Sequence, residues 1–143
     1  MSKKFPIVLI IDDAQKFREF CEFVIKRTTK WIRVYVAKDG LEGLKMYEQY
    51  EPDLILLDLN MPKVDGFDVL KYIIKKDKNT KIIVTTSYDD SQENINRVIK
   101  LGAISFLAKP MNHIILMKTV SDALYNGKTT GLNNVKSTVS NLH

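Results

Sequence analysis

Polar residues that could take part in chemistry stand close behind short apolar runs of the sequence. Four such positions carry carboxylates, hydroxyls or an ammonium: Asp12 and Asp13 after residues 7–11, Asp58 after residues 54–57, Thr86 and Ser87 after residues 82–85, and Lys109 with Pro110 after residues 104–107. If the runs are strands of one parallel sheet, their carboxyl ends meet at one edge, where ligands of such sheets bind. We therefore predict that these side chains lie together.

These residue types predict a phosphoryl-transfer site that holds a metal ion. Three neighbouring carboxylates repel one another unless a cation neutralises them, and a hard divalent cation with oxygen ligands does so. Magnesium fits best, because it is held by one or two carboxylates together with water and a phosphate oxygen. Asp58, on a central strand, could then attack phosphorus to form an acyl phosphate. Lys109 would offset charge on the transferring oxygens, and Thr86 would hydrogen-bond the bound phosphoryl group.

Each of these positions, taken alone, also has a purely structural interpretation. Asp13 could cap the helix that follows it, and Asp58 could be a turn residue. The pair Thr86 and Ser87 could cap the next helix, and Lys109 could belong to a surface turn before Pro110. Their joint placement at successive strand ends favours the shared site over four unrelated structural roles.

Apolar strands alternate with amphipathic helices along most of the chain. The predicted strands cover residues 7–11, 32–37, 54–57, 82–85 and 104–107. The spacing of apolar residues predicts helices near residues 17–25, 40–50, 66–76, 90–101 and 112–126. Strands that are apolar throughout and are separated by helices form parallel sheets covered on both faces. The alternation therefore predicts a three-layer α/β domain.

The overall composition is that of an ordinary globular domain. The 143 residues are 45% hydrophobic and 27% charged, which excludes collagen-like, coiled-coil and disordered classes for the whole chain. The net charge of +5 is spread over separate lysine groups, so we expect a solvated surface rather than a nucleic-acid face. No apolar run could span a bilayer and no export signal is evident, so we expect a cytoplasmic location.

Some reactive or aromatic side chains are predicted to have structural roles only. Cys21 falls on the apolar face of the first helix, where we expect a buried, unreactive thiol. Trp31 and Tyr35, at the second strand, are predicted to be packing residues. His113 has no second metal-ligating neighbour in the sequence and no phosphorelay context, so we expect it to be structural or exposed.

The composition changes near the end of the chain. Residues 127–143 consist mainly of Thr, Ser, Asn, Gly and Lys, and lack the apolar residues of a further core. We therefore predict a domain over residues 1–126, followed by a flexible polar tail or a truncated linker over residues 127–143.

The strand-end residues together resemble those of the response-regulator receiver domain of bacterial two-component signalling, of the chemotaxis-regulator type. Four segments carry the resemblance: Ile11-Asp12-Asp13, Leu57-Asp58-Leu59-Asn60-Met61-Pro62 with Asp65-Gly66, Thr85-Thr86-Ser87, and Phe106-Leu107-Ala108-Lys109-Pro110. The likeness covers about residues 5–126. It implies a flavodoxin-like (βα)5 fold, a three-layer sandwich around a five-stranded parallel sheet of order 2-1-3-4-5.

The resemblance also implies roles for individual residues. Asp58 would accept a phosphoryl group from a histidine kinase, and Asp13 would be a direct ligand of Mg²⁺. Asp12 would contact the metal through water, and Asn60 would lend its backbone carbonyl. Lys109 would hold a phosphoryl oxygen and would be joined to Pro110 by a cis peptide bond.

Further implied roles concern the switch and the lifetime of the phosphoryl group. Thr86 and Phe106 resemble the family's switch pair, in which the threonine moves toward the phosphoryl group and the aromatic ring turns inward. Asn60 and Tyr88 occupy positions that in the family set how fast water removes the phosphoryl group. We hypothesise that the bulky Tyr88 shields the acyl phosphate and lengthens its lifetime.

The resulting prediction is a magnesium-dependent phosphoacceptor switch rather than an enzyme acting on a diffusible metabolite. Its partners would be a histidine kinase or phosphotransfer protein and a downstream output protein or domain, with phosphorylation-dependent dimerisation left open. One alternative is the receiver fragment of a larger DNA-binding or enzymatic response regulator. A second is an interaction module independent of phosphorylation, and a third, weaker one is an aspartyl-phosphate hydrolase.

Overall fold

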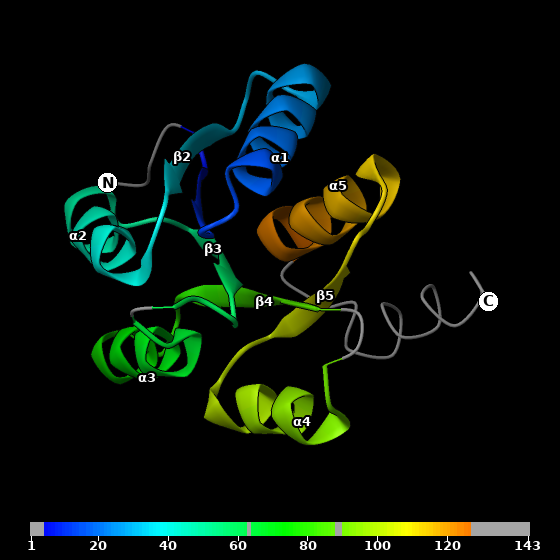
Figure 1. Ribbon diagram of the computed structural model, residues 1–143. Helices are drawn as coiled ribbons and strands as arrows, with labels where there is room; N and C mark the ends of the chain where they lie inside the picture. The colour runs from blue at the N-terminus through cyan, green and yellow to red at the C-terminus, as the bar shows by residue number, and fades with distance from the viewer. Residues whose placement is uncertain (1–4, 63, 88–89, 127–143) are drawn as a thin grey trace.

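Strands and helices alternate strictly in the computed structural model, which describes residues 5–62, 64–87 and 90–126 (Figure 1). The strands are β1 (Ile7–Ile11), β2 (Arg33–Ala37), β3 (Leu54–Asp58), β4 (Lys81–Ser87) and β5 (Ser105–Lys109). The helices are α1 (Gln15–Thr28), α2 (Gly40–Tyr50), α3 (Gly66–Lys76), α4 (Gln92–Leu101) and α5 (His113–Ser121), followed by the π-helical turn η1 (Asp122–Asn126). Within these ranges no helix is both long and apolar enough to cross a membrane.

The five strands form one parallel sheet in the order β2-β1-β3-β4-β5. Helices α1 and α5 cover one face, and α2, α3 and α4 cover the other (Figure 1). The structure thus confirms the flavodoxin-like, three-layer fold with strand order 2-1-3-4-5. Strands β1 and β3 lie inside the sheet, which explains why every one of their residues is buried.

Two apolar cores flank the sheet because successive strand residues point to opposite faces. On β1, Leu9 and Ile11 belong to the core beneath α2, α3 and α4, whereas Val8 and Ile10 belong to the core beneath α1 and α5. All four side chains are essentially inaccessible to solvent. Truncation of one such side chain to alanine typically costs about 2–5 kcal/mol, so the sheet is a rigid support for the residues at its ends.

The helix caps do not use the predicted site residues. The N-cap residue of α1 is Ala14, and no side chain forms a capping hydrogen bond there. The capping interpretation of Asp13 is therefore wrong. Helix α4 is capped by Ser91, whose hydroxyl accepts the backbone N–H of Asn94 at 3.1 Å. Thr86 therefore does not serve as that cap. Neither Asp13 nor Thr86 therefore caps the start of a helix.

The strands extend further toward the carboxyl edge than the sequence predicts. Asp58 pairs with Thr85 and is the last residue of β3, and Ser87 pairs with Lys109 at the ends of β4 and β5. The last helix covers the predicted range, but it is α-helical only to Ser121 and continues to Asn126 as a π-helical turn. The predicted tail, residues 127–143, lies outside the described residues.

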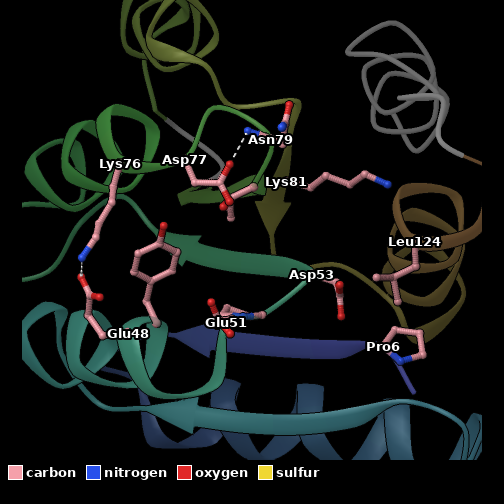
Figure 2. Close-up of a pocket in the computed structure, with 12 residues that line it drawn as sticks. Pro6, Glu48, Glu51, Asp53, Lys76, Asp77, Asn79, Lys81 and Leu124 are labelled. Carbon is pink, nitrogen blue, oxygen red and sulfur yellow. Dashed lines mark hydrogen bonds and ion pairs between the residues drawn. The ribbon is translucent and has the colours of Figure 1, made fainter. Parts of the chain in front are cut away.

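A cavity of about 770 Å³ lies at the opposite, amino-terminal edge of the sheet (Figure 2). Its walls come from the residues before β1 and β3, from the start of β4, and from the ends of α2, α3 and η1. They are Pro6, Tyr47, Glu48, Glu51, Pro52, Asp53, Lys76, Asp77, Asn79, Thr80, Lys81 and Leu124.

Charged side chains of this cavity are engaged in local structure. Glu48 pairs with Lys76, and Asp77 accepts the backbone N–H of Asn79 at 2.9 Å (Figure 2). Asp53 accepts the backbone N–H of Ile7 at 2.8 Å, which fastens the start of β1. None of the predicted site residues lines this cavity.

Candidate functional site

Three aspartates meet at the carboxyl edge of the sheet. One carboxylate oxygen from each of Asp12, Asp13 and Asp58 lies within 4.8 Å of the others. Asp12 and Asp58 are buried, with 1% and 4% of their surfaces exposed, whereas Asp13 is exposed. The predicted cluster of carboxylates is therefore present, with one member facing solvent.

The pairing of β1 with β3 brings these aspartates together. Ile11 is the partner of Leu57, so the next residues, Asp12 and Asp58, leave two neighbouring strands at the same level. The Asp12 carboxylate also accepts the backbone N–H of Ala14 at 2.8 Å, which turns the chain toward α1. Asp12 and Asp58 are 46 positions apart in the sequence, but the parallel register makes them neighbours.

Lys109, at the end of β5, reaches across the sheet edge to these carboxylates. Its Nζ donates a hydrogen bond to Oδ2 of Asp12 at 2.6 Å and lies 3.8 Å from Oδ1 of Asp58. The side chain is 24% exposed, so the ammonium lies at the boundary between the buried carboxylates and solvent. The bond between Lys109 and Pro110 is cis, as the sequence resemblance predicts.

Backbone groups hold the Asp58 segment in place. The Asn60 N–H donates to Oδ1 of Asp58 at 3.1 Å, and the Leu59 N–H donates to the Thr85 carbonyl of β4 at 3.0 Å. Gly66 packs directly against this segment, because a Cβ at Gly66 would lie 2.5 Å from the Asp58 carbonyl oxygen and 2.8 Å from the Leu59 Cα. Only glycine allows α3 to begin so close to the strand end.

Thr86 and Phe106 lie on the adjacent strands β4 and β5, and β4 pairs with the strand that carries Asp58. Both are buried, and Oγ1 of Thr86 has no hydrogen-bond partner among the residues that the structure describes. The Phe106 ring is only 4% exposed, so it takes the inward position here. The outer rim carries Asn60, whose side-chain amide donates to Ser87 Oγ at 3.4 Å and to Asp90 Oδ2 at 3.3 Å. Tyr88, predicted to tune the phosphoryl lifetime, lies outside the described residues.

The electrostatics of the cluster act most strongly on Asp58. Burial raises the pKa of the Asp58 carboxyl, and the negative charge of Asp12 raises it further, whereas Lys109 lowers it. The resulting pKa is about 7. The same neighbourhood affects Cys21 on α1: burial, followed by the charge of Asp12, raises its thiol pKa to about 12. A cation beside Asp58 would therefore favour its ionised form.

Two residues near the cluster were not predicted as site residues. The Phe17 ring of α1 lies beneath the Lys109 ammonium, with 4.4 Å between Nζ and the ring centroid. Arg18, the next residue, donates from Nη1 to the Asp12 carbonyl at 2.9 Å. The sequence marks Phe17 only as part of the apolar helix face. The short distance along the sequence from Asp12 and Asp13 to Phe17 is the one signal that could have placed Phe17 at the site.

Comparison with known proteins identifies the class. The sequence matches the family described as response regulator receiver domain over residues 8–121. The chain therefore belongs to this family, and it is a phosphoacceptor receiver domain of two-component signalling.

The chain is similar to both short and long regulators. It is 35% identical over 103 residues to the chemotaxis protein CheY of Listeria monocytogenes, with 72% of this chain and 85% of that protein covered. It is 34% identical over 113 residues to the transcriptional regulatory protein DegU of Brevibacillus brevis, with 79% of this chain but 48% of that protein covered. The chain thus spans about half the length of this second relative.

Solved structures give the same result. The receiver domain of the Francisella response regulator 1452 has a TM-score of 0.76 and 32% identity, covering 86% of this chain and 99% of that chain. The chemotaxis protein CheY4 of Vibrio cholerae has a TM-score of 0.77 and 28% identity, covering 84% of this chain and 99% of that chain. The likeness extends over the whole sheet and its helices.

Proposed function

We propose that Asp58 is the residue that accepts the phosphoryl group, in a reaction that depends on Mg²⁺. The observation that carries the proposal is the convergence of three carboxylates within 4.8 Å, with the Lys109 ammonium 3.8 Å from Asp58. Asp58 is buried and is the last residue of β3, a central strand that lies between β1 and β4. This position suits a nucleophile held in one orientation.

The proposed transfer forms one bond and breaks one bond. A carboxylate oxygen of Asp58 attacks phosphorus, a P–O bond forms, and the P–N bond to the donor histidine breaks. The electron pair of the P–N bond stays with the donor imidazole. The Asn60 N–H holds Oδ1 of Asp58, which leaves the other oxygen to attack. Lys109 provides positive charge for the transferring oxygens.

The donor set of this edge fits Mg²⁺. Magnesium is bound through one or two carboxylates and retains several waters. Asp13, Asp58 and the backbone carbonyl of Asn60 would hold it directly, and Asp12 would contact it through water. Two hydrogen bonds already engage the Asp12 carboxylate, whereas Asp13 is exposed, which supports this division. When bound, the ion would supply positive charge that offsets the charge on the phosphoryl oxygens.

The signal would pass from Asp58 to the surface formed by α4, β5 and α5. The buried Thr86 hydroxyl, which lacks a partner among the described residues, is available to donate to a phosphoryl oxygen. Phe106, on the adjacent strand, would respond to a movement of Thr86. Asn60 and Tyr88 would tune how fast water removes the phosphoryl group.

The partners follow from this chemistry. A histidine kinase or phosphotransfer protein would deliver the phosphoryl group, and an output protein or domain would read the switched surface. The chain would catalyse its own phosphorylation and dephosphorylation without turning over a diffusible substrate. A cytoplasmic location belongs to the same proposal, because the phosphoryl groups of kinases come from ATP inside the cell. Phosphorylation-dependent dimerisation is left open.

A second candidate is the receiver part of a longer regulator. The match to about half of the DegU protein, and to 32% of a protein-glutamate methylesterase of Koribacter versatilis, favours this candidate. In that case the output, DNA binding or an enzymatic activity, would reside outside the receiver domain. The phosphoryl chemistry at Asp58 would be the same.

The test is the intact mass of the protein after incubation with acetyl phosphate and Mg²⁺. We expect the mass to increase by one phosphoryl group. We expect no increase for Asp58→Asn or when a chelator removes Mg²⁺. Asp77→Asn is the matched control, because it neutralises an aspartate at the opposite edge of the sheet. A folded protein that takes up no phosphoryl group would instead support the interaction module that works without phosphorylation.

A further inference from the structure

The Lys109 ammonium has an aromatic neighbour in addition to its carboxylate partners. Nζ lies 4.4 Å from the centroid of the Phe17 ring, 2.6 Å from Oδ2 of Asp12 and 3.8 Å from Oδ1 of Asp58. A cation within about 6 Å of a ring centroid is attracted by the electron-rich face of the ring. Phe17 therefore contributes a third attraction to the position of this ammonium.

The local structure holds the ring in this place. Phe17 lies in the first turn of α1, where its backbone N–H donates to the Ala14 carbonyl at 3.1 Å. Its ring contacts that of Phe20 on the next turn, with 6.1 Å between centroids. Both rings are half-buried against the core beneath α1 and α5. The ring is thus anchored on one side and presented to Lys109 on the other.

We propose that Phe17 is a positioning residue for phosphoryl transfer, which holds the Lys109 ammonium within reach of Asp58. This inference rests on the proposed function. It assigns a role to Phe17 through Lys109 and not through contact with the phosphoryl group.

The Phe17 ring attracts the Lys109 ammonium without competing for a metal ion, which the carboxylates do not do. Lys109 is 24% exposed on a flexible stem, so water competes for its ammonium. The Asp12 carboxylate, the nearest partner, is also a proposed contact of the metal through water. The ring has no lone pair that a metal ion binds, so its attraction for Lys109 does not compete with metal binding. Phe17 would therefore keep the ammonium near Asp58 when Asp12 is otherwise engaged.

Fluorinated phenylalanines at position 17 test the proposal in the full 143-residue chain. Replacing Phe17 with 4-fluoro-, 3,5-difluoro- and 3,4,5-trifluorophenylalanine weakens the negative face of the ring while keeping its shape. Phe20 is the matched control, because its ring is likewise half-buried on α1 against the same core, whereas the Lys109 ammonium lies over the Phe17 ring. The same series at Phe20 reports any general effect of fluorine on α1.

Two readouts are measured on each protein. The first is the rate constant of phosphorylation by acetyl phosphate with Mg²⁺. The second is the set of NMR chemical shifts of the Lys109 side chain in metal-free protein. A ring beneath the side chain shifts these resonances upfield, and comparison with Lys109→Arg assigns them. We expect the rate to fall stepwise by about three- to tenfold across the Phe17 series, with little change across the Phe20 series.

Conservative variants complete the test. Phe17→Tyr keeps an electron-rich ring and should keep the rate and the shifted resonances, whereas Phe17→Leu keeps burial but should lose both. Equal rates across the Phe17 series, or equal losses at Phe17 and Phe20, would overturn the proposal, as would unshifted Lys109 resonances in the unmodified protein. If the unmodified protein takes up no phosphoryl group, the proposed function fails. The resonances then still decide whether the ring holds Lys109.

Discussion

The ammonium of Lys109 donates a 2.6 Å hydrogen bond to the carboxylate of Asp12, a residue at the far end of the domain sequence. The bond joins the end of β5, an edge strand, to the residue that follows β1 near the centre of the sheet. It passes beside Asp58, which lies on β3, one of the two strands between β1 and β5. The site thus depends on charges contributed by three strands.

The raised pKa of Asp58 predicts a pH dependence of stability. Burial and the charge of Asp12 raise this pKa to about 7, whereas an aspartate in the unfolded chain has a pKa of roughly 4. Between these values the folded chain keeps a proton that the unfolded chain releases, so the free energy of unfolding falls as the pH rises. Above about pH 7 the loss is complete.

The variant Asp58→Asn removes this titration. In metal-free buffer we expect it to exceed the unmodified protein in free energy of unfolding by about 2–4 kcal/mol at pH 8, with a much smaller difference at pH 4. Urea unfolding at both pH values measures this. Asp77→Asn, measured in the same way, is the control for removal of an aspartate at the opposite edge of the sheet. An advantage of Asp58→Asn that is the same at both pH values would contradict the assignment of the raised pKa to Asp58.

Magnesium should stabilise the folded protein through the aspartate cluster. A ligand that binds only the folded state raises the free energy of unfolding by RT ln(1 + [L]/Kd), so the melting temperature should increase with Mg²⁺ concentration. Asp13→Asn removes the exposed carboxylate and should abolish the increase. Thermal unfolding by circular dichroism, with Asp77→Asn as control, measures the effect. A full increase in Asp13→Asn would remove Asp13 from the proposed ligands.

Thr85 and Thr86 form a matched pair for testing the switch. Both hydroxyls are buried without a hydrogen-bond partner among the described residues, and the two side chains point to opposite faces of β4. Valine has the same shape without the hydroxyl, so each substitution should leave stability unchanged or raise it by about 1 kcal/mol.

Only Thr86→Val should disturb signalling. We expect phosphorylation-induced changes in the amide spectra of α4 and β5 to be lost in Thr86→Val and retained in Thr85→Val. Two-dimensional NMR with and without the phosphodonor measures this. The switch role of Thr86 would be refuted if both variants kept the full spectral change.

Cys21 should be unreactive in the folded protein. Its side chain is fully buried, and burial together with the Asp12 charge raises the thiol pKa to about 12, so very little thiolate exists at neutral pH. We expect a thiol reagent such as DTNB to react only as fast as the protein unfolds. Stopped-flow mixing in native buffer and in urea compares the two rates, and rapid reaction in native buffer would contradict the expectation.

The fold and the carboxylate cluster could be predicted because both follow from patterns along the chain. Apolar strands separated by amphipathic helices specify a parallel sheet, and strand-end residues of such a sheet share one edge. Asp12, Asp58 and Lys109 were found on this basis alone. The resemblance then added the cis bond to Pro110, which the structure confirms.

Other features depend on distances that no pattern encodes. The position of Phe17 beneath Lys109 depends on how α1 crosses the end of β5, and the need for Gly66 depends on how closely α3 approaches Asp58. Trp31, a predicted packing residue, contacts the Phe5 ring at 5.4 Å between centroids but stays 56% exposed, because it lies in the connection between α1 and β2 and not in the strand. An aromatic residue beside a predicted strand is therefore a weak indicator of burial.

The position of Lys109 at the end of the last strand has a consequence for synthesis of the protein. As the chain leaves the ribosome, β1 and β3 can pair and bring Asp12 close to Asp58 while β5 is still unmade. The ammonium that offsets these charges arrives only with the end of β5. A nascent or prematurely ended chain that lacks residue 109 would carry the clustered acids without their counter-charge. The docking of β5 therefore brings in the positive charge that partly offsets the repulsion between these acids.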